Sequence, residues 1–217
     1  MRLTALAAAL LCGSALAAPL PAAAQVFRWA NDGDVNSMDP YTRNETFLLA
    51  FNSHIYEPLV RRNRQMEPEP ALAERWEQPS PTVWRFHLRR GVRFTDGTPF
   101  TADDVVFSVQ RARGPGSQLN ANFATVKEVR KIDDHTVEFE TVEPNPIFAR
   151  EIATVGMMSR TWAERNNAVR PADLTTREEN FATRNAMGTG PFRLVSREPD
   201  RRTVLERNPG WWDTPTH

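Results

Sequence analysis

Cysteine is almost absent from this sequence. One residue in 217, Cys12, carries a thiol, and it lies in an apolar stretch near the N-terminus. The rest of the chain therefore has no disulfide, no zinc site built on cysteine and no cysteine nucleophile. A domain without such cross-links depends on the burial of apolar side chains, which favours a moderately large fold over a small extracellular module.

An excess of charge of either sign is also absent. The chain has 27 basic and 27 acidic residues and a formal net charge of +0, and no run of Lys or Arg is longer than two. Nucleic-acid binding, which needs a basic surface, is therefore not expected. With 40% hydrophobic and 25% charged residues, the composition is typical of a globular protein with one domain or two small lobes.

Acidic residues are missing before Asp32, and the start of the chain differs from everything that follows. Arg2 precedes an apolar stretch over Leu3–Leu16, and Ala22–Ala24 fits the small-residue pattern of a cleavage site. This arrangement predicts a secretory signal peptide over residues 1–24. A membrane anchor is the alternative, but the apolar stretch is shorter than the ~20 residues that a spanning helix needs.

A lipid anchor is not expected either. Bacterial lipoproteins carry lipid on a cysteine that follows a small residue, whereas Cys12 follows Leu10 and Leu11. We therefore expect an exported, periplasmic product that is not embedded in the membrane.

Catalytic and metal-binding motifs are absent as well. The four histidines lie too far apart for paired zinc ligands, and no Gly-x-Ser-x-Gly motif occurs. Gly188–Gly190 begins like a dinucleotide-binding loop, but the pattern fails at Arg193. The acid pairs Asp103–Asp104 and Asp133–Asp134 are better explained as a helix start and a turn. We therefore predict no catalytic residue, no metal ligand and no cofactor, and a protein that is not an enzyme.

The hydrophobic pattern predicts both strands and helices. Alternation over Thr82–Leu88 is typical of a half-buried strand, and Thr101 with Asp104 forms a capping-box pattern for a helix that ends at Gly114–Gly116. The other expected strands are Val26–Ala30, Glu128–Ile132, His135–Thr141, Phe192–Ser196 and Thr203–Arg207, and the other expected helices are Thr46–Tyr56, Ala71–Trp76 and Pro146–Val155. The irregular order favours a mixed α/β (α+β) fold over a doubly wound one.

Five sequence segments identify a family. They are Tyr56–Val60 (YEPLV), Trp84–Arg89 (WRFHLR), Gly91–Val105 (GVRFTDGTPFTADDV), Gly188–Phe192 (GTGPF) and Glu206–Trp212 (ERNPGWW). In this order and spacing, the chain closely resembles solute-binding protein family 5, the extracellular component of peptide- and nickel-type ABC importers. Taken singly, the segments are core aromatics, turns and breaks, so we expect them to build the fold rather than to bind ligand.

The resemblance implies a periplasmic-binding-protein-like type II fold with two lobes that close over a ligand. Residues 25–53 and 187–217 would form the ligand-facing part of lobe one, and residues 54–186 an inserted accessory subdomain. The second lobe would lie further downstream and is missing, so the sequence resembles an N-terminal fragment. A truncated product that transports nothing is therefore one alternative. A secreted hydrolase is a weaker one, because no nucleophile and base occur in register.

The resemblance also implies a function and partners. We expect a periplasmic monomer that delivers a small peptide or a similar solute to the permease subunits of an ABC importer. The mechanism would be binding with hinge closure, in which the ligand shifts the population toward the closed form. Nickel chelates, sugars and opines remain alternative ligands.

The expected ligand-binding residues lie in the loop after the first predicted strand. Family members use this loop to contact ligand, and Asn44 occupies the matching position, which is a carboxylate in some relatives. Asn44 is a neutral amide that can only donate and accept hydrogen bonds. Its neighbours Arg43 and Glu45 carry opposite charges, so that one of them could meet a carboxylate. We predict Asn44, Arg43 and Glu45 as ligand-binding residues, with a solvated loop as the alternative.

Overall fold

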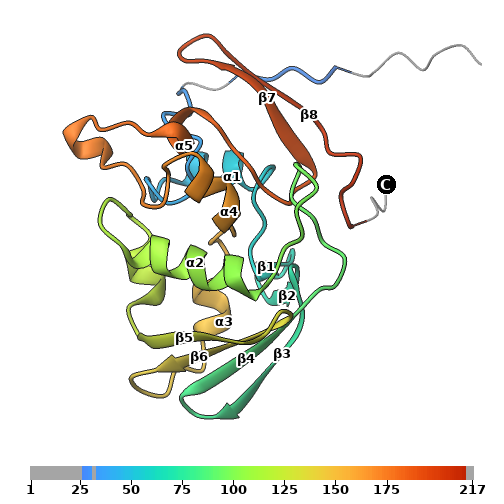
Figure 1. The fold of residues 1–217 in the computed structure, drawn as a ribbon, viewed down its shortest axis with the longest axis vertical. Helices are drawn as coiled ribbons and strands as arrows, with labels where there is room; N and C mark the ends of the chain where they lie inside the picture. The colour runs from blue at the N-terminus through green and yellow to red at the C-terminus, as the bar shows by residue number, and fades with distance from the viewer. Residues whose placement is uncertain (1–25, 31–32, 214–217) are drawn as a thin grey trace, which may run out of the picture. The chain divides into compact units, whose positions relative to one another are not determined.

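The computed structural model describes residues 26–30 and 33–213 (Figure 1). The chain divides into two compact units, Met1–Asp32 and Gly33–His217, and every described helix and strand belongs to the second. The predicted signal peptide, residues 1–24, lies outside the described residues. In the first unit Val26–Ala30 is exposed coil, so the strand predicted there is wrong. A strand needs a hydrogen-bonded neighbour, and none of the three sheets includes these residues.

The second unit combines short helices with three antiparallel sheets. Its helices are α1 (Thr46–Asn52), α2 (Ala102–Arg113), α3 (Phe148–Glu151), α4 (Arg160–Arg165) and α5 (Phe181–Arg184), with 3₁₀ turns at Asn120–Phe123 and Leu174–Thr176. Its strands are β1 (Val60–Arg62), β2 (Pro68–Pro70), β3 (Ala73–Ser80), β4 (Val83–Leu88), β5 (Val126–Asp133), β6 (Thr136–Thr141), β7 (Phe192–Glu198) and β8 (Arg202–Arg207). The mixed α/β prediction is confirmed.

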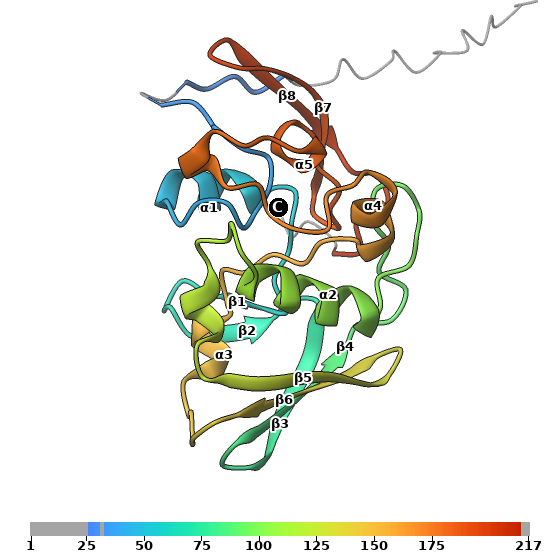
Figure 2. The ribbon, with the colours of Figure 1, turned by 60° about the vertical axis from the view of Figure 1, so that its left-hand side comes forward.

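The largest sheet has four strands in the order β3-β4-β6-β5. Strand β4 alternates between half-buried and buried positions, as its sequence predicts, and Trp84, Phe86 and Leu88 point into the core. Helix α2 lies across the same face of the sheet (Figure 2). The ring of Phe148, in α3, lies 5.1 Å from that of Phe139 in β6, and Phe139 is 5.5 Å from Phe86. Aromatic packing therefore joins the helices to the sheet.

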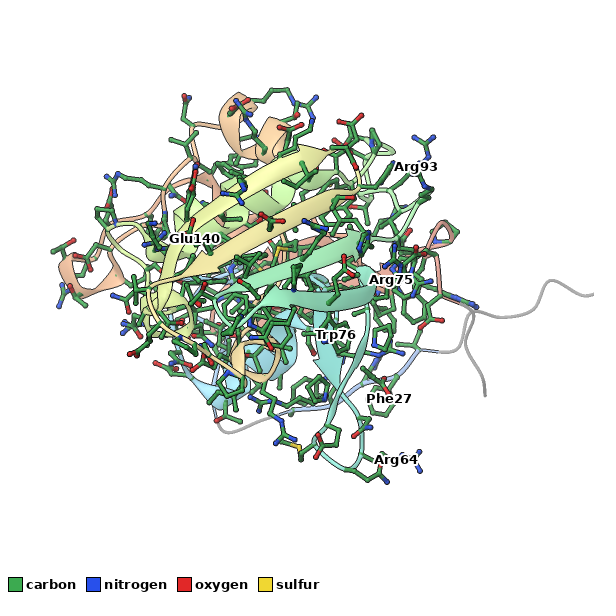
Figure 3. The ribbon with its side chains drawn as sticks, turned by 90° about the horizontal axis from the view of Figure 1, so that it is seen from below. Phe27, Arg64, Arg75, Trp76, Arg93 and Glu140 are labelled. Atoms are coloured by element: carbon green, nitrogen blue, oxygen red, sulfur yellow. The ribbon has the colours of Figure 1, made fainter. Side chains whose placement is uncertain are left out.

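The outer face of this sheet is charged. Figure 3 views it, with Arg75 of β3 and Glu140 of β6 labelled. The carboxylate of Glu138 lies between two guanidinium groups, accepting hydrogen bonds from Arg85 (2.7 Å) and from Arg130. Opposite charges on neighbouring strands stabilise such a face by cross-strand pairing and keep it soluble.

The first strand of the sheet replaces a predicted helix. The helix predicted over Ala71–Trp76 is wrong, because Ala73–Ser80 forms β3 and pairs with β4. Trp76 lies opposite Phe86, with ring centroids 6.3 Å apart. The gain from this pairing outweighs the local helix propensity, which is only a few tenths of a kcal/mol per residue.

Other local predictions are confirmed. Helix α2 begins after Thr101, whose backbone N–H donates to the Asp104 carboxylate (2.9 Å), and Gly114 follows its last residue. The β7–β8 hairpin turns at Pro199–Asp200 as expected. The helices predicted over 46–56 and 146–155 are present but shorter, as α1 and α3.

Candidate functional site

The three predicted ligand-binding residues form an exposed loop directly before α1. Asn44 and Glu45 are exposed, and Arg43 is half-buried, with its Nε 3.9 Å from the Glu45 carboxylate. Within the described part of the chain, the buried Nε of Arg43 has no hydrogen-bond partner. The structure therefore brings these side chains together at the surface. Their contact with a ligand stays a prediction.

A buried ion pair fixes the start of this loop. Both oxygens of Asp39 accept hydrogen bonds from the Arg111 guanidinium of α2, at 2.7 and 2.6 Å, and both side chains are fully enclosed. Asp39 also accepts from the backbone N–H of Tyr41 (3.1 Å). Burial lowers the pKa of the Arg111 guanidinium, whereas the charge of Asp39 raises it. The pKa of Arg111 therefore lies above its ordinary value. Sequence reasoning recognised only a turn at Asp39, because its partner lies 72 residues away.

A second contact holds the middle of the loop. The backbone N–H of Gln118 donates to the carbonyl of Tyr41 (2.9 Å), and the Gln118 side-chain oxygen accepts from the backbone N–H of Asn44 (3.2 Å). The hydroxyl of Ser117 also donates to the Tyr41 carbonyl (3.3 Å). The main chain of Asn44 is thus committed to the protein, and no hydrogen bond of the described residues uses its side-chain amide. Sequence reasoning missed Gln118, which carries no local signal.

Three of the family-like segments meet at the carboxylate of Glu57. Its oxygens accept hydrogen bonds from the hydroxyl of Thr189 (2.8 Å) and from the indole N–H groups of Trp211 (3.1 Å) and Trp212 (2.9 Å). Glu57 is buried, with 6% of its surface exposed. Burial raises the pKa of this carboxyl, and the hydrogen bonds from Trp212, Thr189 and Trp211 offset that rise in part.

The glycines of the fourth segment allow two backbones to approach closely. A Cβ on Gly188 would lie 1.9 Å from the carbonyl oxygen of Ile55, and one on Gly190 would lie 2.7 Å from it. The backbone N–H of Gly190 donates to that same oxygen (2.9 Å). Because Gly188 and Gly190 have no Cβ, residues 188–190 pack directly against the turn after α1, beside Glu57.

Two arginines hold the residues that follow β8. The guanidinium of Arg89 lies 4.1 Å from the centroid of the Trp212 ring, a cation–π contact. Arg61 pairs with Asp213 (3.2 Å) and with Glu69 (2.7 Å). The segments that contain Glu57, Thr189 and Trp211–Trp212 therefore pack on one another. Residues 43–45, the predicted recognition loop, lie apart from them in sequence, before α1.

Across residues 26–30 and 33–213, no three side chains of His, Cys, Asp or Glu gather closely enough to hold a metal ion. None of the helices in the described ranges has the length and apolar composition that crossing a bilayer requires.

Comparison with known families identifies the chain's relatives. A family model described as bacterial extracellular solute-binding proteins, family 5 Middle, matches residues 67–217. The periplasmic oligopeptide-binding protein OppA of Salmonella typhimurium is 32% identical over an alignment of 237 positions, gaps included, which covers 97% of this chain and 41% of that protein. The chain thus spans about two fifths of the length of this curated relative.

Solved structures share the fold. The periplasmic binding protein DppA from Helicobacter pylori, in complex with the peptide STSA, has a TM-score of 0.70 and 26% identity, covering 83% of this chain and 38% of that one. The protein MoaA from A. tumefaciens R10, in complex with mannopinic acid, has a TM-score of 0.70 and 28% identity, covering 82% and 36%. The predicted periplasmic-binding-protein-like fold is confirmed. The division into residues 25–53, 54–186 and 187–217 stays a prediction.

Proposed function

Because this chain belongs to family 5 of the bacterial extracellular solute-binding proteins, we propose that it forms part of a receptor for short peptides. The receptor binds its ligand outside the inner membrane and delivers it to the permease subunits of an ABC importer, without catalysis. Export to the periplasm by the signal peptide and a monomeric state belong to the same proposal. The names of the relatives, which include oligopeptide-binding and peptide-bound proteins, support it.

One observation carries the proposal: the side chain of Asn44 is exposed on a loop whose main chain is already held. Asp39 fixes the turn before the loop, and Gln118 occupies the backbone N–H of Asn44. An amide can donate to a peptide carbonyl and accept from a peptide N–H. A fixed main chain with an available amide is therefore suited to a peptide backbone, because little ordering of the loop is needed on binding.

The charges beside Asn44 bear on the ends of the ligand. Arg43 makes a long contact with Glu45 (3.9 Å), and 26% of its side chain is exposed. A guanidinium in this state can meet the carboxylate of a ligand. Contacts from a second lobe, and closure of the two lobes on the ligand, complete the proposed mechanism.

The test is calorimetry on the full gene product with tri-alanine as the ligand. We expect micromolar affinity or better. Asn44→Ala should weaken binding about fivefold, the effect of one neutral hydrogen bond. Asn120→Ala, an exposed asparagine in the turn at 120–123, is the matched control and should leave the affinity unchanged. Equal affinities of Asn44→Ala and the wild type would remove Asn44 from the site.

A second experiment addresses the class of ligand. Mass spectrometry of solute that co-purifies with the full gene product should detect short peptides. An opine-like sugar acid in their place, as in the mannopinic acid complex of MoaA, would reject the peptide assignment and retain the receptor. Cleavage of tri-alanine during incubation would instead favour a hydrolase.

A further inference from the structure

Glu57 is a buried acid, and in the described part of the chain no hydrogen bond or ion pair joins its carboxylate to a cation. The groups that donate to its carboxylate are a hydroxyl and two indole N–H groups, which lie 132, 154 and 155 residues further along the chain. Its backbone carbonyl accepts from Met157 (2.8 Å). One residue thus ties the turn after α1 to three distant segments. Such an arrangement is more than the ordinary packing of a core requires.

The three donors require a carboxylate at this point. An indole N–H can only donate, so each tryptophan needs an acceptor, and Thr189 adds a third donor. A carboxylate offers two acceptor oxygens, and here Oε1 serves Trp211 while Oε2 serves Trp212 and Thr189. Glutamine has one oxygen and one NH₂ group. It would therefore set a donor against at least one indole N–H.

The contacts around Glu57 join two functional parts of the molecule. On one side, the backbone N–H of Tyr56 donates to the carbonyl of Asn52, the last residue of α1 (2.8 Å). Glu57 is therefore held directly after the helix that follows the recognition loop. On the other side, Trp211 and Trp212 follow β8, and Arg61 adds its pair with Asp213 (3.2 Å).

We propose that Glu57 is a positioning residue for ligand capture: it locks Trp211–Asp213 to the end of α1, so that the recognition loop and the segment after β8 move as one body. The lock keeps Arg43, Asn44 and Glu45 in a fixed place relative to Trp211–Asp213. This inference rests on the proposed function, and its structural half can be tested without any ligand.

The test compares Glu57→Gln with the wild type in the full gene product. Hydrogen exchange at residues 211–213 should accelerate about tenfold or more, the effect of losing a hydrogen bond to a charged group. Tryptophan emission should shift to longer wavelength as the indoles gain water. The affinity for tri-alanine, measured well below the melting temperature, should fall about tenfold by the same reasoning.

Glu138→Gln is the matched control. Glu138 is also a buried carboxylate, but it lies on the outer face of the large sheet between Arg85 and Arg130. This variant should lower the melting temperature and leave exchange at 211–213, tryptophan emission and tri-alanine affinity unchanged. If Glu57 serves stability alone, Glu57→Gln will lower the melting temperature and leave the affinity for tri-alanine unchanged, and that result would overturn the proposal.

A double-mutant cycle tests the lock itself. Trp212→Phe keeps the ring over which Arg89 lies and removes the N–H. If Glu57 and Trp212 act through their hydrogen bond, the effects of Glu57→Gln and Trp212→Phe on exchange at 211–213 will not add. Additive effects would overturn the lock. A wild type that binds no tri-alanine would contradict the proposed function and the ligand half of this inference, while the exchange cycle would still decide the lock.

Discussion

Two buried acids, Asp39 and Glu57, hold the two ends of the region behind the recognition loop, and they are neutralised differently. Asp39 faces a full positive charge, Arg111, through two short hydrogen bonds. Glu57 faces neutral donors, namely two indoles and a hydroxyl. An amide at position 39 would leave the buried charge of Arg111 without a counter-charge, whereas an amide at position 57 would leave no buried cation unpaired. The same chemical change should therefore have unequal effects at the two sites.

The largest effect is expected from Asp39→Asn. It leaves the Arg111 charge buried without a counter-charge, and breaking such a pair costs about 3–5 kcal/mol of unfolding free energy. Urea denaturation should give the highest free energy of unfolding for the wild type, a lower one for Glu57→Gln and the lowest for Asp39→Asn. A smaller loss for Asp39→Asn than for Glu57→Gln would break the comparison.

A second variant separates charge from shape at this site. Asp39→Leu with Arg111→Met removes both charges and keeps apolar volume, and replacing a buried pair in this way is often nearly neutral. The double variant should recover much of the stability that Asp39→Asn loses. The double variant should still weaken tri-alanine binding, because Asp39 no longer fixes the turn before Asn44.

The next largest effect on the free energy of unfolding is expected from a substitution beside Glu57, at Gly188. Gly188→Ala would place a Cβ 1.9 Å from the carbonyl oxygen of Ile55, a backbone atom that cannot move aside without shifting the turn after α1. Overpacking of this kind costs about 1–3 kcal/mol in unfolding free energy. Gly33→Ala is the control, because its Cβ would have no atom within 4 Å. Equal denaturation midpoints for both variants would show that the turn after α1 yields easily.

Local elements of the fold could be predicted from the sequence, because their signals lie within a few residues. The alternation in β4 and the pairing of Thr101 with Asp104 are of this kind. Ala71–Trp76 was predicted wrongly because its state depends on β4, which lies further along the chain. The strand at Val26–Ala30 failed for a related reason, since alternation alone supplies no partner strand.

Less of the candidate site than of the fold could be predicted from the sequence. The positions of Asn44, Arg43 and Glu45 could be selected through the family resemblance, and the structure places them on one exposed loop. The residues that hold this loop in place could not be predicted from the sequence. The partner of Asp39 is 72 residues away, and that of the Asn44 backbone is 74 residues away. The side-chain partners of Glu57 lie further away still, up to 155 residues along the chain, so they could not be predicted from the sequence.

The smallest expected effect is in the pH dependence of stability, and it arises at Glu57. Burial raises the pKa of Glu57 above its ordinary value, while the hydrogen bonds and the charge of Arg61 lower it in part. The folded protein therefore binds a proton at Glu57 at a pH where the unfolded chain is still ionised. As pH falls from the folded-state pKa to the ordinary value, this residue adds stability; below both values it adds nothing further.

Denaturation curves of wild type and Glu57→Gln across this window test the sign, because all other groups cancel in the difference. The charged groups near the site, Arg61, Arg89 and Asp213, are common to both proteins. The wild type should gain on Glu57→Gln as the solution is acidified. A wild type that instead loses ground would mean that Glu57 has a depressed pKa in the folded protein, as expected of an acid paired with a cation. The description of Glu57 as an acid held by neutral donors would then be wrong.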